Sequence, residues 1–279
     1  MSSNYRASCV IGYPAKHSRS PKLHGYWLDK YAIAGEYRSE EIPPEDIDKF
    51  ISNLAANGYV GANVTMPHKD AAFRLSQPDK KAQLIGAANT LWLDGEVLRS
   101  TNTDGDGYIK SLESVVPNWN ESLSRAIVLG AGGASRAIVN ALLDCGVPSI
   151  YVVNRTLAKS EIMRENYGDK IIPKSWDSLP EALPKVGLLV NTTSLGMHGQ
   201  PALEVDINLL PRTAIVSDIV YVPLKTPLLA GAEARGLPTT DGLQMLLHQA
   251  VCGFELWFGI RPEVTQEQYD LMASDIPIN

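Results

Sequence analysis

The sequence has no long apolar run and little cysteine. Nowhere do about 18 apolar residues follow one another, so no segment is predicted to span a membrane. The start, MSSNYRASCVIGYP, has no basic segment followed by an apolar stretch, so we expect a soluble, cytoplasmic protein. Its three cysteines, Cys9, Cys145 and Cys252, are an odd number at wide spacing. This spacing fits neither a disulfide framework nor a zinc knuckle, and it predicts buried, reduced thiols.

Clusters of basic residues, repeats and metal-binding patterns are also missing. Lys and Arg number 25 against 31 Asp and Glu, and no run of positive charge suits a nucleic-acid backbone. We therefore expect neither nucleic acid nor a membrane as partner. The five histidines show no metal-ligand spacing, so no metal site is expected. No repeat of 20 to 50 residues is visible, which excludes solenoids and propellers.

What remains is a pattern of alternating strands and helices. With 279 residues, 44% hydrophobic and 20% charged, the chain is long enough for two globular domains. In the first third, apolar runs predict strands at residues 7–11, 37–42 and 59–64, with helices after Pro21 and from Pro44. This alternation predicts a largely parallel sheet.

A second series of the same kind begins near residue 126. Strands are predicted at residues 126–129, 149–153, 187–191 and 214–219, and a buried helix at 137–143 completes a βαβ unit. The last long helix, residues 243–258, carries apolar side chains at spacings of three and four. Because no further strand precedes it, we expect this helix to pack back on the first domain.

The glycine-rich segment GAGGAS occupies residues 130–135, between a predicted strand and a predicted helix. Glycines there allow a tight turn and the close approach of a pyrophosphate to the helix N-terminus. The candidate contacts are Gly130, Gly132, Gly133 and Ala134. Ser135 replaces the usual third small residue, and a glycine turn that only packs helix on strand is the alternative.

The end of the next strand indicates which dinucleotide is bound. NAD-binding chains usually place Asp or Glu there, but this chain has Asn154, followed by Arg155, Thr156 and Lys159. A guanidinium can grip a 2′-phosphate with two hydrogen bonds, and a nearby ammonium adds charge. The pattern favours NADP over NAD, unless both cations are only solvated surface charges.

Polar residues gather near predicted strand ends in the first third. Ser18 and Ser20 lie on a loop before a helix, where they either hold a carboxylate or cap the helix. Lys69 follows Pro67, which we expect in the first turn of a helix, where a cation is unfavourable. A local rule broken in this way hints at function, although the alternative is a solvated lysine.

Two further polar segments each follow an apolar run. They are Asn89-Thr90 and the sequence NTDG at residues 102–105. Amides and a carboxylate at the ends of strands suit a ligand with several hydroxyl groups. Asp104 has a second interpretation, as the cap of the helix that follows it.

Taken together, these motifs closely resemble the shikimate dehydrogenase family. In chain order they are HSRSP, NVTMPHK, GAANTL, NTDGDG, GAGGASRA, NRT, NTTSLGM and DGLQMLLHQA. The resemblance implies an α/β substrate domain at residues 1–104, completed by residues 241–279, and a doubly wound Rossmann-type NADP domain at residues 105–240. It also implies reversible reduction of 3-dehydroshikimate to shikimate, in aromatic amino-acid precursor biosynthesis (the chorismate pathway), by a monomer or homodimer.

The resemblance also implies roles for individual residues. Ser18 and Ser20 would bind the substrate carboxylate, helped by Thr65 and Tyr221. Lys69 and Asp104 would form the catalytic pair. The ring hydroxyls would be held by Asp104 and by three amides, those of Asn63, Asn89 and Gln249. Gly242 joins the expected cofactor contacts. Lys159 stands where relatives often have a second arginine, which predicts a weaker preference for NADP.

Two alternatives to this function are kept. One is a paralogue that oxidises quinate, with NAD as cofactor; the serine pair speaks mildly against quinate, and Arg155 against NAD. The other is a non-catalytic module that senses NADP. The presence of both Lys69 and Asp104 argues against a sensor, since a sensor need not keep the pair.

Overall fold

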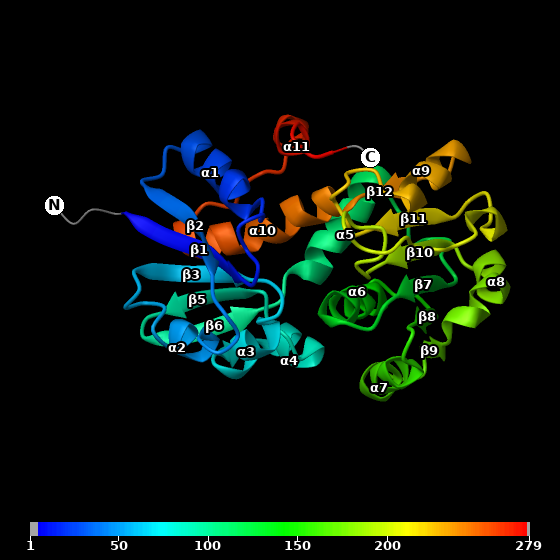
Figure 1. Ribbon diagram of the computed structural model, residues 1–279, viewed down its shortest axis with the longest axis horizontal. Coiled ribbons are helices and arrows are strands. Elements are labelled where there is room, and N and C mark those ends of the chain that lie inside the picture. The colour runs from blue at the N-terminus through cyan, green and yellow to red at the C-terminus, as the bar shows by residue number, and fades with distance from the viewer. Residues whose placement is uncertain (1–4, 278–279) are drawn as a thin grey trace. The chain divides into compact units, whose positions relative to one another are not determined.

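The computed structural model describes residues 5–277 (Figure 1). Within that range the chain divides into two compact units. Unit 1 comprises residues 5–103 and 249–272, and unit 2 comprises residues 104–248 and 273–277. Among the described residues, no helix combines the length and apolarity that crossing a bilayer requires.

Unit 1 contains a six-stranded mixed sheet in the order β2-β1-β3-β5-β6-β4. Its strands are β1 (Arg6–Gly12), β2 (Gly35–Glu41), β3 (Tyr59–Val64), β4 (Gln77–Pro78), β5 (Thr90–Asp94) and β6 (Val97–Thr101). The prediction of a largely parallel sheet is right for β1, β2 and β3, but β5 runs antiparallel to both β3 and β6. A tight hairpin joins β5 to β6 at Gly95, whose φ is +63°. The two-residue loop is Gly95-Glu96, and a glycine at its first position is a hairpin signal that the strand pattern alone did not use.

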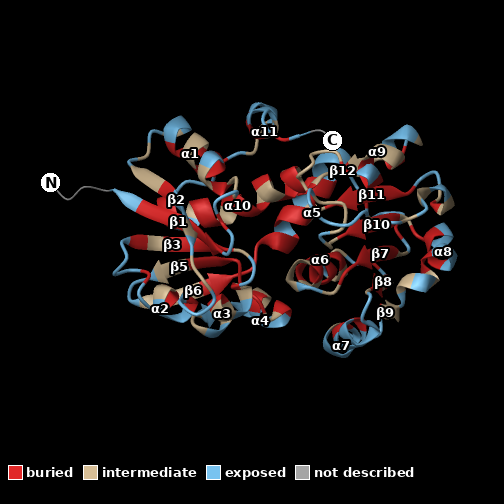
Figure 2. Ribbon diagram, viewed as in Figure 1, coloured by how far each residue is buried: buried red, intermediate tan, exposed pale blue. Residues whose placement is uncertain are grey.

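Six helices contribute to unit 1, and the last two come from the C-terminal part of the chain. They are α1 (Ser20–Lys30), α2 (Ile47–Ser52), α3 (Lys69–Arg74), α4 (Lys80–Ile85), the second half of α10 (Gly242–Phe258) and α11 (Gln266–Ala273). In α10, Trp257 is 1% exposed and its Nε1 donates to the carbonyl of Leu91 at 2.8 Å. This confirms the expected return of the long helix to the first domain, and Figure 2 shows the buried strands and the buried stretches of α10.

Unit 2 contains a six-stranded sheet that is parallel throughout, in the order β12-β11-β10-β7-β8-β9. Its strands are β7 (Ala126–Leu129), β8 (Ile150–Val153), β9 (Ile171–Lys174), β10 (Leu188–Asn191), β11 (Ile215–Asp218) and β12 (Thr239–Thr240). Numbered along the chain, this is the 3-2-1-4-5-6 order of a doubly wound nucleotide-binding sheet. The predicted Rossmann-type domain is confirmed.

Helices cover both faces of this sheet. The α-helices are α5 (Asp104–Val115), α6 (Gly133–Asp144), α7 (Leu157–Tyr167), α8 (Leu179–Ala182), α9 (Pro227–Ala234) and the first part of α10, with short 3-10 turns at 176–178, 183–185 and 207–209. In β7, Val128 packs in the cluster that includes Ile138 of α6, while Leu129 packs in the cluster that includes Leu228 of α9. A strand buried on both faces reads as a continuous apolar run, as residues 126–129 do.

The cysteines follow the prediction only in part. Cys9 lies fully buried in β1, but Cys145 and Cys252 are partly exposed. All three are free thiols. Two of the three positions therefore differ from the expected buried state: Cys145 directly follows the end of α6, and Cys252 lies within α10.

Candidate functional site

Strand direction in unit 1 brings three chain segments to one edge of the sheet. Asn63, near the end of β3, pairs with Thr90, and Thr90 also pairs with Thr101 at the end of β6. The sequence pattern placed Asn89 and Thr90 after a strand, which is wrong, because Thr90 is the first residue of β5. Since β5 is antiparallel, its beginning lies beside the ends of its neighbours, and the polar groups still converge.

The converging side chains form a buried hydrogen-bonded network. Asn63 Nδ2 donates to Thr90 Oγ1 at 3.3 Å and to the carbonyl of Asn89 at 3.3 Å. Asn89 Oδ1 accepts from the backbone N–H of Thr103 at 2.9 Å. Asn89 Nδ2 donates to Thr103 Oγ1 at 3.0 Å and to Gln249 Oε1 at 3.5 Å. The expected amides of unit 1, Asn63, Asn89 and Gln249, are therefore brought together, and Thr90 and Thr103 join them.

Tyr37 is a member of this network that sequence reasoning missed. Its hydroxyl donates to Asn63 Oδ1 at 2.7 Å. Burial raises the pKa of Tyr37 well above its usual value. The residue pattern assigned Tyr37 only to a strand, and nothing in the sequence marked a contact across 26 residues with Asn63.

The serine loop and the segment after β3 belong to the same unit. Ser20 is the first residue of α1 and is buried, while Ser18 is partly exposed. The N-cap position is occupied by Arg19 and not by either serine, which corrects the capping alternative, although the Ser20 N–H donates to Ser18 Oγ at 3.3 Å. Thr65 directly follows β3, is partly exposed and donates its N–H to the carbonyl of Ile11 at 2.9 Å.

Lys69 is partly buried and is the first residue of α3. Pro67 lies before the helix and not in its first turn, which corrects the expectation, and His68 occupies the N-cap position. The ring of His68 is buried, with Nε2 at 2.7 Å from the carbonyl of Ile42, a structural contact. The carbonyl of Lys69 accepts from the N–H of Ala88 at 3.1 Å, so Lys69 lies beside the segment that carries Asn89.

Asp104 begins α5 and follows Thr103 of the network directly in the chain. It is 7% exposed, and a carboxylate is favoured in the first turn of a helix. Asp104 belongs to unit 2, whereas Lys69 belongs to unit 1. Among the other expected contacts, Tyr221 also belongs to unit 2, in the loop after β11, where it is partly exposed.

In unit 2, the glycine-rich turn fits a dinucleotide phosphate. Gly130 has φ +108°, and a Cβ there would lie 2.7 Å from Thr192 Oγ1. Gly132 is the N-cap of α6, and a Cβ there would meet no described atom within 4 Å, so open space lies in front of the helix. Within the described chain α6 has no side-chain cap and no acidic residue in its first turn. Gly133 and Ala134 open that turn, and its N–H groups suit an anion.

Ser135 and Gly242 have structural reasons for their identities. Ser135 is buried and donates Oγ to the carbonyl of Gly130 at 2.7 Å, which ties the turn to the helix. This bond explains a serine where the usual pattern has Gly or Ala. At Gly242, the first residue of α10, a Cβ would lie 2.1 Å from the carbonyl oxygen of Ile219. The position requires glycine for backbone packing.

The residues after β8 fit a 2′-phosphate. Asn154 Nδ2 donates to the carbonyl of Thr156 at 2.9 Å, which shapes the turn into α7. Arg155, Thr156 and Lys159 are exposed. Within residues 5–277, neither Arg155 nor Lys159 has a carboxylate partner at ion-pair distance. Both cations are therefore available to a phosphate, and no carboxylate at the strand end opposes one.

A second buried network, not expected from the sequence, fixes the loops after β10 and β11. Asp218 is 1% exposed and accepts from Asn191 Nδ2 at 2.9 Å, from the Val220 N–H at 3.0 Å and from Thr226 Oγ1 at 2.8 Å. Burial raises the pKa of Asp218 to about 6, against these hydrogen bonds. Asn191 Oδ1 in turn accepts from the hydroxyl of Thr193 at 2.7 Å. The only sequence signal was the position of Asn191 and Asp218 at the ends of predicted strands.

Comparison with known proteins gives the family. Models match residues 10–91 to the shikimate dehydrogenase substrate binding domain, 112–199 to shikimate / quinate 5-dehydrogenase and 242–266 to the shikimate 5′-dehydrogenase C-terminal domain. The chain belongs to the shikimate dehydrogenase family. It is 55% identical over 271 residues to the shikimate dehydrogenase (NADP(+)) of Nitrobacter winogradskyi, covering 97% of each chain.

Solved structures of the family are similar in fold over nearly the whole chain. The shikimate 5-dehydrogenase of Thermus thermophilus, in complex with NADP(H) and shikimate, has a TM-score of 0.86 and 31% identity, covering 96% of this chain and 98% of that one. The quinate dehydrogenase of Corynebacterium glutamicum, in complex with NAD, has a TM-score of 0.88 and 27% identity, covering 97% and 100%.

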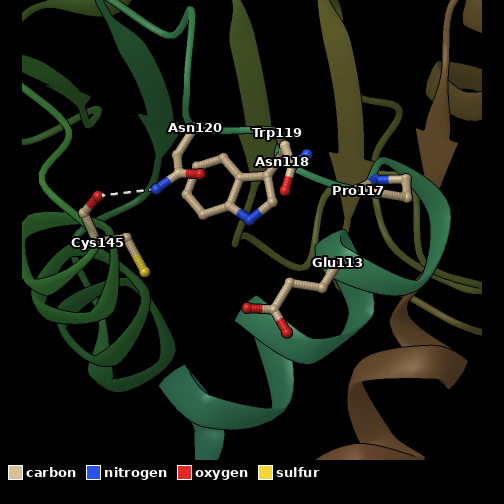
Figure 3. A pocket seen from close by; sticks show the side chains of 6 residues that line it. All are labelled: Glu113, Pro117, Asn118, Trp119, Asn120 and Cys145. Atoms are coloured by element: carbon tan, nitrogen blue, oxygen red, sulfur yellow. Dashed lines mark hydrogen bonds between the residues drawn. The ribbon is translucent and has the colours of Figure 1, made fainter.

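One cavity of unit 2 lies apart from the residues that match the family motifs. It has a volume of about 250 Å³ and is lined by Glu113, Pro117, Asn118, Trp119, Asn120 and Cys145 (Figure 3). Asn120 Nδ2 donates to the carbonyl of Cys145 at 3.1 Å. No residue expected to bind substrate or cofactor lines this cavity.

Proposed function

We propose that this chain catalyses the reversible, NADPH-dependent reduction of 3-dehydroshikimate to shikimate. The proposal places the reaction in aromatic amino-acid precursor biosynthesis, in the cytoplasm, with a monomer or homodimer as the active form. Residues 1–104 with 241–279 would bind substrate, and residues 105–240 would bind NADP. The observation that carries it is the buried network of amides and hydroxyls at one sheet edge of a shikimate dehydrogenase family member.

The network suits a ring that carries several hydroxyl groups. The amides of Asn63, Asn89 and Gln249 present both donors and acceptors, and each of these side chains is at most 9% exposed. A site built to hydrogen-bond hydroxyl groups rejects analogues that lack them, because its own buried groups would lose their partners. The carboxylate of the same substrate would be bound by the hydroxyl groups of Ser18, Ser20, Thr65 and Tyr221.

Lys69 and Asp104 are assigned the proton chemistry. NADPH, when bound, supplies a hydride to the ring ketone. Negative charge then develops on the ketone oxygen, and the ammonium of Lys69 stabilises that charge and donates a proton. Asp104 is assigned to the same catalytic pair and would bind a ring hydroxyl.

In the cofactor domain, backbone N–H groups at Gly132, Gly133 and Ala134 hold the pyrophosphate, while Gly130 lets the turn pass close to Thr192. Arg155 and Lys159 hold the 2′-phosphate, and Asn154 and Thr156 shape the surrounding turn. The lysine has one charge but no planar fork, so we expect NADP to be preferred less strictly than with two arginines.

Quinate oxidation with NAD is the second candidate, because a quinate dehydrogenase bound to NAD shares the fold with a TM-score of 0.88. The decisive experiment is a matrix of initial rates for shikimate or quinate, each with NADP or NAD. The highest kcat/KM is expected for shikimate with NADP. A higher value for quinate with NAD would replace the proposal with the second candidate, and cofactor binding without any turnover would support an NADP sensor.

Substitution of Lys69 tests the assigned chemistry. Lys69→Ala should lower kcat by about a hundredfold or more and leave the KM for shikimate little changed. The exposed Lys30, at the end of α1, provides the matched control, and Lys30→Ala should leave both constants unchanged. A large rise in KM with kcat intact would make Lys69 a binding residue instead.

A further inference from the structure

The hydroxyl of Tyr37 is hydrogen-bonded to one of the proposed substrate contacts. It donates to Asn63 Oδ1 at 2.7 Å, and Asn63 continues into the network of Thr90 and Asn89. One buried oxygen of β2 therefore reaches the amides of the sheet edge.

Strand order explains how Tyr37 reaches this position. Tyr37 is on β2 and Asn63 is on β3, and β1 lies between these strands. Tyr37 pairs with Ser8 of β1, and Asn63 pairs with Val10 two residues further along the same strand. Alternate residues share one face of a sheet, so both side chains project on the same side of it.

The surroundings of Tyr37 hold its ring in one place. The ring of His24 stacks on it, with centroids 4.0 Å apart and planes 9° apart, and Trp257 lies against it at 5.9 Å. His24 and Trp257 are themselves 0% and 1% exposed. These close-packed aromatic neighbours restrict the movement of the ring and hold its hydroxyl beside Asn63.

The direction of the hydrogen bond determines how Asn63 is oriented. Burial keeps Tyr37 protonated at ordinary pH, so its hydroxyl remains a donor. The donor selects the amide orientation in which Oδ1 faces Tyr37 and Nδ2 faces the sheet edge. Both bonds donated by Nδ2 measure 3.3 Å, long enough to be exchanged for a shorter bond to a ligand oxygen.

We infer that Tyr37 is a positioning residue that sets the orientation of Asn63. It would thereby fix where unit 1 presents an amide N–H to a ring hydroxyl of the substrate. The inference rests on the proposed function, in which Asn63 contacts a hydroxyl group. It adds a residue that is not itself expected to touch the reacting atoms.

Tyr37→Phe tests the inference, because it removes one oxygen and keeps the stacked ring. Loss of one buried hydrogen bond that orders the site should raise the KM for shikimate about tenfold. The kcat and the KM for NADP should change by less than about twofold, because the proton donor and the cofactor domain are untouched. Tyr59→Phe is the matched control: Tyr59 is a buried tyrosine of the same sheet whose hydroxyl donates to Glu40 instead.

A double-mutant cycle separates positioning from general support of the fold. If Tyr37 acts through Asn63, the variant Tyr37→Phe/Asn63→Ala should have a KM for shikimate no higher than that of Asn63→Ala alone. A merely structural role would lower the melting temperature of Tyr37→Phe and leave its KM at the wild-type value. An unchanged KM, or fully additive effects in the double variant, would overturn the inference.

Calorimetric binding of shikimate distinguishes failure of the inference from failure of the proposed function. If the wild type binds shikimate without turning it over, the proposed function is wrong, while the dissociation constants of wild type and Tyr37→Phe still test Tyr37. Turnover by the wild type together with equal dissociation constants for the two proteins would refute only the inference. A wild type that neither binds nor turns over shikimate would overturn both.

Discussion

Acid should destabilise unit 1 through a single histidine, His24. Its ring is fully buried among aromatic side chains, stacked on Tyr37 at 4.0 Å and close to Trp27 and Phe254. Burial lowers the pKa of His24 from 6.5 to about 3, and neither ring nitrogen has a hydrogen-bond partner among the described residues. The folded protein therefore keeps a neutral imidazole at pH values where the unfolded chain carries a charged one.

The sign and size of the effect follow from proton linkage. Between pH 6.5 and 3 the unfolded state binds a proton that the folded state does not, so the free energy of unfolding falls as the pH falls. The slope approaches about 1.4 kcal/mol per pH unit, which gives a loss of about 2 kcal/mol between pH 7 and pH 5.

Urea unfolding of wild type and His24→Phe, at pH 7 and pH 5, measures this contribution. Phenylalanine keeps the stacking on Tyr37 but cannot bind a proton, so the stability difference between the two proteins should shift by about 2 kcal/mol in favour of the variant at pH 5. Comparing the proteins at each pH cancels all other titrating groups. Leu23→Ala, at a fully buried position of the same helix, is the control and should cost the same at both pH values. An equal pH dependence of wild type and His24→Phe would refute the reasoning.

Three further predictions concern unit 2. In the folded protein the pKa of Asp218 is raised to about 6. Its contribution to the free energy of unfolding is therefore present below pH 3.8 and is lost as the pH rises through 6. In thermal unfolding, the wild type should lose about 2 kcal/mol of stability relative to Asp218→Asn between pH 4 and pH 7. Arg155→Asp should raise the KM for NADP more than about tenfold and that for NAD much less, while Arg164→Asp on α7 should change neither. Gly130→Ala should lower stability by about 1–3 kcal/mol, whereas Gly132→Ala should keep wild-type stability and raise only the KM for NADP.

The nucleotide-binding unit could be predicted well because its determinants are local. The strand at residues 126–129 has the predicted bounds, since a short run of four buried apolar residues between loops has few alternatives. Glycines directly after it then indicate the turn into α6, and the parallel order follows from the alternation of strands and helices. In this sheet, consecutive strands lie side by side except β9 and β10, between which the strand order reverses.

Unit 1 was harder to predict because its site depends on strand direction and on contacts that skip a strand. A period-two pattern does not reveal whether β5 runs with or against β3, so Asn89 was placed at the wrong end of its strand. The prediction of the site survived because an antiparallel strand begins where its neighbours end. Tyr37 was missed for a different reason: its partner lies two strands away, and only the strand order β2-β1-β3 brings them together.

The two buried polar networks solve the same physical problem in the two units. Asn63 and Asn89 in unit 1, and Asn191 and Asp218 in unit 2, lie within a residue of the strand ends from which they reach inward. Removing such groups from water costs free energy unless each finds a partner, and here the partners come from neighbouring strands and loops. An apolar core would be at least as stable, but it would leave the loops free to shift. A satisfied polar network instead fixes the loops to one geometry, which is what a site that must orient a substrate requires.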